Sequence, residues 1–535
     1  MISSFGFNPL AMRVSPQCAP IRLMRSSIRA RRSRGANRWF ATETYFKNSD
    51  QDFSPLACTW LTRTPQAIKP DDILSSLPPR SSADAASDSV PLLLVTPSFA
   101  HWIDTSNPFL ESLIGRLFPG FPNSTPVYAV AAVVDKLPNS MHSRASGSGE
   151  IGDSEFLSTQ PEGLSLLTIQ RENVRGKAAA ARRIGGPAGE DPDLVISIED
   201  TSASKGTAHD VGLRLANTVF VNGKESTLMG MRWIYNNDVG AYALSQSVNL
   251  TSCYVTSVCA TTEPSLTLPL DPVGERRRVI TGMGNILRQV SKSTDPTSVE
   301  AMPASTELET ALPRYIKEHN IVDQRVSVWA LVEKPEMDTA SREFTSTQDR
   351  VTHSLRKGGK LHRVMSGGGG WGKKQGLLSL DPEVSFPGMN RPDDLVTLYQ
   401  IFNPSADAPM EWPSFLANGM IGEDLSLLSQ VATEGDFIEF FVGLEPKHSQ
   451  DDNASNADAR GSVTYRFGVV ANADEVNVES TSENKHDLVV VPNSFGALSE
   501  KAITYSQPLV DGAETSRSST KLDIPGCRVI FNSVQ

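Results

Sequence analysis

The residues with the clearest chemical potential lie in one segment, 350–380, of this 535-residue chain. The segment holds seven Lys or Arg residues and eight glycines but no acid, whereas the whole chain has a net charge of −11. Glycine lets successive backbone N–H groups point into one concavity, and neighbouring lysines add positive charge. These residues together predict a site for an anion or a phosphate group.

The centre of this segment supplies the candidate ligand contacts. A tryptophan among the glycines can stack on a base or pack over the loop. The candidate anion- or ligand-binding residues are Arg363, Ser366, Gly367, Gly368, Gly369, Gly370, Trp371, Gly372, Lys373 and Lys374. The alternative interpretation is a flexible glycine loop whose charges are only solvated.

The same string nearly matches the phosphate-binding loop G-x4-G-K-[ST] of nucleoside triphosphatases. In Gly367-x4-Gly372-Lys373-Lys374, however, Lys374 replaces the hydroxyl residue that binds magnesium. The following residues, Leu377–Pro382, cannot continue a long helix because they end in proline. Since the N-terminus of that helix normally cradles the phosphates, the sequence argues against a nucleoside triphosphatase.

No catalytic constellation is recognisable elsewhere in the sequence. It contains no GxSxG elbow, no HExxH motif and no CxxC pair. We interpret Cys253 and Cys259 as two buried thiols, and Arg276-Arg277-Arg278, which precedes a predicted strand, as a solvated turn. The sequence therefore favours a binding module over an enzyme, and it identifies no metal site and no cofactor.

The first forty residues predict a cleavable mitochondrial transit peptide. Residues 1–42 contain eight arginines and no Asp, Glu or Lys. Arg22, Arg25 and Arg29 are three and four positions apart and so share one face of a helix, which is typical of such leaders. Arg38-Trp39-Phe40-Ala41 resembles a matrix cleavage site, so the predicted cut follows Phe40. The alternative is a basic arm that binds RNA or a membrane.

Removal of the leader changes the charge of the protein. The net charge falls from −11 to about −19, because the leader carries eight positive charges. This balance disfavours non-specific nucleic-acid binding by the body of the protein but leaves room for one local basic site. No run of 18 apolar residues is present, so no membrane-spanning helix is expected. The predicted location is the mitochondrial matrix.

Strand and helix signals alternate along the mature chain. Val90–Pro97 and Pro126–Val134 predict buried strands, separated by a helix that begins after Asn107-Pro108 and ends before Pro119-Gly120. Glu307–Leu312 predicts a short helix that Pro313 limits. Further strands are predicted at Gly163–Gln170, Asp193–Ile198, Arg278–Val290, Arg325–Val332, Asp394–Phe402, Phe437–Gly443 and Ser462–Val470.

These signals predict an α/β or α+β fold with two layered domains, mixed sheets and long disordered insertions. An N-terminal α/β domain is expected over residues 41–270, and a strand-rich α+β domain that contains the basic glycine loop over 271–535. Polar low-complexity stretches are expected to be loops outside any core, at residues 72–88, 138–160, 447–461, 473–486 and 511–520.

The order of elements resembles the FIST family, intracellular ligand-sensing domains that are also found attached to an F-box. VPLLLVTPSFA, a helix and then FPGFPNSTPVYAVAA resemble that family's opening strand, helix and "pviG" strand. Gly284–Val290 followed by Pro303–Glu309 resembles the start of its C-terminal region, and Glu434-Gly435-Asp436 resembles its late "eGd" strand.

The chain departs from the family where Ala129–Asp135 replaces a small-residue stretch and where segment 350–380 has no counterpart. The resemblance implies a non-enzymatic sensing or scaffold module, with no catalytic residues to carry over.

Two functional hypotheses follow. The first is a soluble matrix protein that acts as a binding or scaffold module, with the glycine loop contacting a small anionic ligand. The alternative, from a different class, is a mitochondrial RNA- or ribosome-associated factor that uses the same loop on phosphates. The sequence identifies no protein partner for either.

Replacing both Lys373 and Lys374 by alanine tests whether the glycine loop binds anything. We expect weaker binding of the anionic ligand or partner, because the variant loses two positive charges beside the glycines. Titrating salt separates the hypotheses, since contacts to several phosphates weaken steeply as salt rises and a small-ligand site is less sensitive. Unchanged ligands and partners in the double variant would show that the loop is not a binding element.

Overall fold

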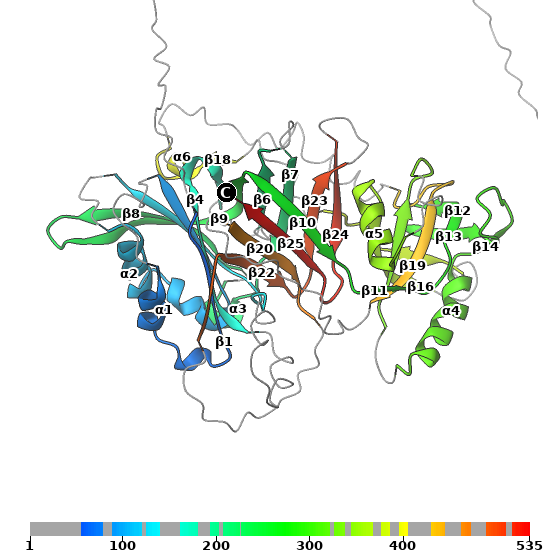
Figure 1. Cartoon of the computed structure of the whole chain (residues 1–535), viewed down its shortest axis with the longest axis horizontal. Coiled ribbons are helices and arrows are strands. Elements are labelled where there is room, and N and C mark those ends of the chain that lie inside the picture. The colour runs from blue at the N-terminus through cyan, green and yellow to red at the C-terminus, as the bar shows by residue number, and fades with distance from the viewer. Residues whose placement is uncertain are drawn as a thin grey trace, which may run out of the picture. The chain divides into compact units, whose positions relative to one another are not determined.

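The computed structural model (Figure 1) describes one compact unit within residues 53–535. The described residues are 55–78, 88–119, 125–139, 161–179, 193–202, 207–224, 226–321, 326–337, 344–367, 376–385, 395–404, 430–443, 462–471, 488–509 and 516–534. The predicted transit peptide lies outside these residues. Three sheets and several helices form the unit, which confirms the predicted class of α/β or α+β with mixed sheets.

The largest sheet has 13 strands and is mixed. Its β2–β3 and β6–β9 pairs are parallel, and its other pairs are antiparallel. In spatial order its path is β21 (Val489–Pro492), β1 (Ala57–Thr62), β4 (Glu162–Gln170), β2 (Ser89–Val95), β3 (Val127–Val133), β8 (Leu228–Asn236), β9 (Ala241–Cys259), β6 (Asp193–Asp200), β7 (Thr207–Arg214), β23 (Ile503–Pro508) and β24 (Arg517–Leu522), while β5 (Val174–Ala178) pairs with β9 and β18 (Val396–Thr397) with β5.

The opening strands and helix form where the sequence predicts them. Every residue of β2 and β3 is buried, as expected for strands covered on both faces. Between them, α2 (Pro108–Leu117) begins at the predicted cap, where the Asn107 side chain accepts a hydrogen bond from the Phe109 N–H. Leu93 and Val95 pack into one core with α2, whereas Leu92 and Leu94 point into a second core on the other face.

A second sheet covers that other face. It consists of β10 (Thr261–Thr267), β25 (Arg528–Val534), β20 (Ser462–Val469) and β22 (Ser494–Ser499). Its Tyr465, Phe467 and Phe495 are fully buried in the core that they share with Leu92 and Leu94. Strands from the last fifty residues thus pair with strands from the first half of the chain. The first two sheets therefore contain residues from both sides of the expected domain boundary at residue 270.

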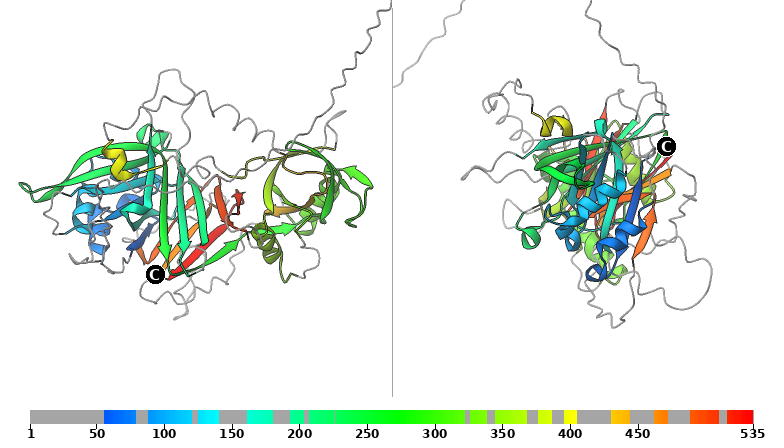
Figure 2. Two further views of the ribbon diagram at one scale, coloured as in Figure 1. Left: turned by 90° about the horizontal axis from the view of Figure 1, so that it is seen from above. Right: turned by 90° about the vertical axis from the view of Figure 1, so that its left-hand side faces the viewer.

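The third sheet closes on itself (Figure 2, left). Six antiparallel strands form the ring, and the last one, β19, pairs with both the first and the fifth. In ring order they are β12 (Arg277–Met283), β13 (Ile286–Ser291), β17 (Leu378–Leu380), β16 (Lys360–Gly367), β15 (Val328–Glu333) and β19 (Phe437–Gly443), while β11 (Leu270–Pro272) and β14 (Ala301–Pro303) extend β19 and β13. We call this ring the barrel.

The helix α4 (Ser305–Glu318) packs on the barrel core through Leu308, Ala311 and Tyr315. The prediction that Pro313 limits this helix is wrong, because Pro313 lies inside it. A proline inside a helix removes one hydrogen bond and crowds the carbonyl group four residues earlier. The buried residues on both sides of Pro313 offset that cost. The remaining helices are α1 (Pro70–Ser76), α3 (Val219–Asn222), α5 (Thr347–Arg356) and α6 (Leu398–Phe402), with short 3-10 turns at η1 (Pro65–Ala67), η2 (Pro97–Ile103) and η5 (Arg171–Asn173).

Several predicted boundaries differ from the structure for local reasons. The predicted strand Arg278–Val290 is the hairpin β12–β13, because Gly284 adopts a left-handed φ of 59° at the turn. The predicted strand Asp394–Phe402 is mostly α6, which begins at a reciprocal cap between Thr397 and Gln400.

Two expected loops contain regular structure. Within 72–88, Ile73 and Leu74 of α1 are buried, and within 511–520 the described part belongs to β24. The described elements otherwise confirm the predicted strands at β4, β6, β19 and β20 and, with shifted ends, β15. Cys253 and Cys259 are buried free thiols, as predicted.

A pair of glycine substitutions tests the close β1–β4 contact. We expect Gly163→Ala to destabilise the protein by several kcal/mol, because its Cβ would lie 1.9 Å from the Trp60 carbonyl oxygen in β1. Gly115→Ala in α2 is the control. Its Cβ meets nothing within 4 Å, so we expect a gain of up to about 1 kcal/mol from helix propensity. Urea unfolding measures both, and equal effects of the two substitutions would contradict the described register.

Candidate ligand-binding groove

A bend in β16 opens the barrel wall between β15 and β16. The first half of β16 pairs with β15, and this pairing ends at Trp329↔Arg363. The second half pairs instead with β17, from Val364↔Leu380 to Gly367↔Leu378, with a bulge at Met365. A strand that pairs first with one neighbour and then with another must bend away from the first, and β-bulges produce such bends. Beyond Arg363 the two strands therefore part.

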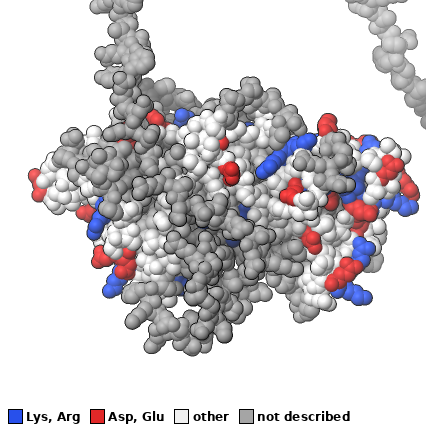
Figure 3. Space-filling model, viewed as in Figure 1, with Lys and Arg blue, Asp and Glu red and all other residues white. Residues whose placement is uncertain are grey.

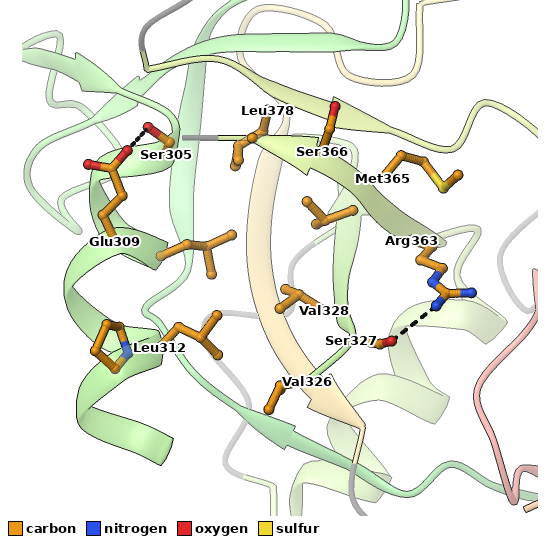
Figure 4. A pocket seen from close by; sticks show the side chains of 14 residues that line it. Ser305, Glu309, Leu312, Val326, Ser327, Val328, Arg363, Met365, Ser366 and Leu378 are labelled. Atoms are coloured by element: carbon orange, nitrogen blue, oxygen red, sulfur yellow. Dashed lines mark hydrogen bonds between the residues drawn. The ribbon is translucent and has the colours of Figure 1, made fainter. Parts of the chain in front are cut away.

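The opening is a groove of about 610 Å³ between the barrel wall and α4 (Figure 4). Its walls are mainly apolar, and hydroxyl groups and two charged side chains are placed among them. The lining residues are Ser305, Leu308, Glu309, Leu312 and Pro313 of α4, Val326, Ser327 and Val328 at the start of β15, Arg363, Val364, Met365, Ser366 and Gly367 of β16, and Leu378 of β17. Pockets of this size with a few polar groups commonly bind small molecules.

Arg363 is the basic side chain of the groove. Its guanidinium donates a hydrogen bond to the Ser327 hydroxyl at 3.0 Å and lies 5.9 Å from the centre of the Trp329 ring. No ion pair between Arg363 and a carboxylate occurs among the described residues. Since a guanidinium has five N–H donors, Arg363 keeps donors for an anion.

Glu309 is the acidic side chain of the groove and comes from the opposite wall (Figure 4). Its carboxylate accepts a hydrogen bond from the Ser305 hydroxyl at 2.7 Å. Arg363 and Glu309 give the groove one positive and one negative side, so a bound ligand with a single charge would have a preferred orientation.

Three of the sequence-predicted site residues lie in this groove, namely Arg363, Ser366 and Gly367. The other seven, Gly368, Gly369, Gly370, Trp371, Gly372, Lys373 and Lys374, lie outside the described residues. On the far side of that segment, the Gly376 carbonyl accepts the Ser305 N–H of α4 at 3.2 Å. The chain then continues into the strand β17, so no helix follows the glycines as a nucleoside triphosphatase would require.

Two other described positive charges of segment 350–380, Arg350 and Lys360, are held in contacts inside the protein. Arg350 pairs with Glu333 at 3.1 Å and with Glu439 inside the barrel–α5 contact. The Lys360 ammonium donates to the Ser518 hydroxyl at 2.9 Å, and burial lowers its pKa to about 8. On the face shown in Figure 3, basic and acidic side chains are interspersed over the barrel.

The interpretation of Arg276-Arg277-Arg278 as a solvated turn is wrong for its first two residues. Arg276 donates to Glu333 at 2.7 Å and lies 3.7 Å from the centre of the Phe437 ring. Arg277 donates to Glu307, also at 2.7 Å. The signal that sequence reasoning missed was the acid at the end of the apolar run VWALVE, since a buried carboxylate requires cations nearby.

Burial and charge shift the pKa values of the two acids in this cluster in opposite directions. Burial raises the pKa of Glu333, but Arg350, Arg276 and Ser354 together outweigh it and lower that pKa below its usual value. Burial is the larger influence on Glu439 and raises its pKa despite the contact with Arg350. These residues fix α5 to the barrel wall and lie outside the groove lining.

No match to a known protein assigns this groove. No family model matches the chain, and neither a curated protein nor a solved structure is similar to it at a significant level. Within the described part of the chain, no helix is long and apolar enough to cross a membrane. In the same residues, no group of three His, Cys, Asp or Glu side chains could hold a metal ion.

Buried histidines should make the fold acid-sensitive. Burial lowers the pKa of His362 in β16, and that of His209 in β7, to about 4. Because the unfolded chain then binds more protons between pH 6.5 and 4, stability falls as the pH falls through this window, by roughly 3 kcal/mol per histidine at most. We expect His362→Gln to lose less stability than the wild type between pH 7 and 4, and His209→Gln to act additively. Denaturant unfolding at both pH values is the measurement, and parallel losses in all proteins would contradict this account.

Proposed function

We propose that this protein is a non-enzymatic, FIST-like ligand-binding module of the mitochondrial matrix, which holds a small anionic ligand in the groove between α4 and the barrel. The observation that carries the proposal is the position of Arg363, Ser366 and Gly367. These residues line an apolar groove of about 610 Å³, and the basic glycine-rich segment follows Gly367 in the sequence. The glycines and lysines beyond Gly367 are proposed as further ligand contacts.

The groove composition supports binding of a small molecule. Apolar walls from α4, β15 and β16 can bury the body of a ligand, and the few polar groups can fix its orientation. The Ser305 hydroxyl donates a hydrogen bond to Glu309, and the Ser327 hydroxyl accepts one from Arg363. These hydrogen bonds hold the two charged side chains in place and so reduce the entropy lost when a ligand binds.

The alternative, an RNA- or ribosome-associated factor, receives less support from the same residues. A backbone of phosphates requires several exposed cations along a track. Arg350 and Lys360, two of the seven positive charges in segment 350–380, are committed to contacts inside the protein. The mature net charge of about −19 also opposes a nucleic acid.

A groove-filling variant tests the proposal. Leu312 is half-buried and lines the groove, so we expect Leu312→Trp to exclude the ligand. Thr310→Trp is the control, because Thr310 lies on the exposed side of the same helix. Native mass spectrometry of proteins purified gently from mitochondria should show chains that begin at Ala41, with a small molecule retained by the wild type and by Thr310→Trp but not by Leu312→Trp.

Other outcomes would contradict the proposal. A wild-type chain without a small molecule, or an equal amount of ligand on Leu312→Trp, would place the function elsewhere. Co-purification of RNA or ribosomal proteins would favour the alternative. A chain that keeps its first forty residues would contradict the proposed import.

A further inference from the structure

The charges of the groove also indicate the chemical class of its ligand. We infer that the groove binds an amphipathic monocarboxylate, with the carboxylate on Arg363 and an aliphatic body along α4. This inference rests on the proposed function, because it concerns the same groove. Of the fourteen residues that line the groove, Arg363 is the single cation and Glu309 the single acid.

Arg363 is held in position for one carboxylate. Ser327 accepts one of its N–H donors at 3.0 Å, and the guanidinium lies beside the Trp329 ring, whose Nε1 donates to Asp523 at 2.6 Å. The fork of remaining donors matches the two oxygens of a carboxylate. The Asp523 carboxylate already interacts electrostatically with Arg363, so a monoanion suits this site better than a group with two or three charges.

The rest of the groove favours a hydrocarbon body. Leu312 of α4 faces Val328 and Leu378 of the barrel across the groove (Figure 4). Leu308 and Val364 also line it. Each methylene buried between such walls should tighten binding by about fourfold. A chain that extends from Arg363 along these side chains therefore gains affinity with length until it fills the groove.

Glu309 sets the direction of the ligand. It lies on the wall opposite Arg363 and already accepts the Ser305 hydroxyl at 2.7 Å. A carboxylate at that end would face a like charge, which disfavours binding. The carboxylate is therefore directed to Arg363, where Ser366 on the same strand adds a second hydroxyl to the lining.

Three probes with the same tail test the inference, namely octanoate, 1-octanol and octylamine. Isothermal titration of the mature wild-type chain should give octanoate the tightest binding. Arg363→Gln should weaken octanoate by about 10- to 100-fold, the effect of losing a charged hydrogen bond, and should leave octanol unchanged. Arg314→Gln is the matched control, with less than about threefold change for octanoate, because Arg314 is exposed on α4 and lies outside the groove lining. Both side chains are exposed, so neither substitution should disturb folding.

Each contrary result has a distinct meaning. Octanol or octylamine binding as tightly as octanoate, or octanoate binding that Arg363→Gln leaves intact, would overturn the inferred ligand class. Failure of all three probes to bind, while wild-type protein retains a small molecule that Leu312→Trp lacks, would overturn it too but leave the proposed function standing. If Leu312→Trp retained that molecule, the proposed function itself would fail.

Discussion

The groove depends on one constraint: to close the barrel, β16 must pair with two different strands, β15 and β17. Six antiparallel strands close only if the strand between β15 and β17 pairs with each of them. β16 satisfies both by pairing with β15 up to Arg363 and with β17 from Val364 onward, and the bulge at Met365 supplies the bend. The gap that this leaves in the wall is covered on one side by α4, whose Leu308, Ala311 and Tyr315 pack on the barrel core. The same bend in β16 therefore closes the barrel and opens the groove.

Buried charge connects α5 to three strands of the barrel. Arg350 of α5 reaches Glu333 at the end of β15 and Glu439 in the middle of β19, and Arg276 reaches Glu333 from the start of β12. Two carboxylates, Glu439 and the 1% exposed Glu333, thus connect three barrel strands and a helix through Arg276 and Arg350. Breaking such a pair leaves a buried charge without compensation and typically costs about 3–5 kcal/mol. The cluster joins β12, β15 and β19 at the end of β15 that lies away from the groove, since Glu333 ends this strand and Val328, which lines the groove, begins it.

The sequence predicted local structure well where burial is complete and pairing is short-range. VPLLLV and VYAVAAV are buried at every position, and such short apolar runs indicate strands that are covered on both faces. The Asn107-Pro108 cap likewise carries its own local signal. Pairing between distant segments carries no such signal. Nothing in Leu378–Leu380 identifies its partners on β13 and β16, and nothing in Arg363 shows that its neighbours are Ser327 and Trp329. Three of the ten predicted site residues lie in the groove, but the apolar walls that give it a shape come from α4 and β15, far away in sequence.

Those walls change how the basic glycine segment is understood. On sequence alone, glycines and lysines point to phosphate, because both groups serve that chemistry in nucleotide-binding loops. Such loops rely on the N-terminus of a following helix, whereas here the chain enters β17. The described residues from which the segment departs adjoin leucine and valine side chains and a single arginine. A polyphosphate would bury little against those walls and would leave most of its charge uncompensated by Arg363, while a ligand with one charge and an apolar body uses both features. The groove therefore suits a ligand that contacts the apolar walls with a hydrocarbon body as well as Arg363 with its charge.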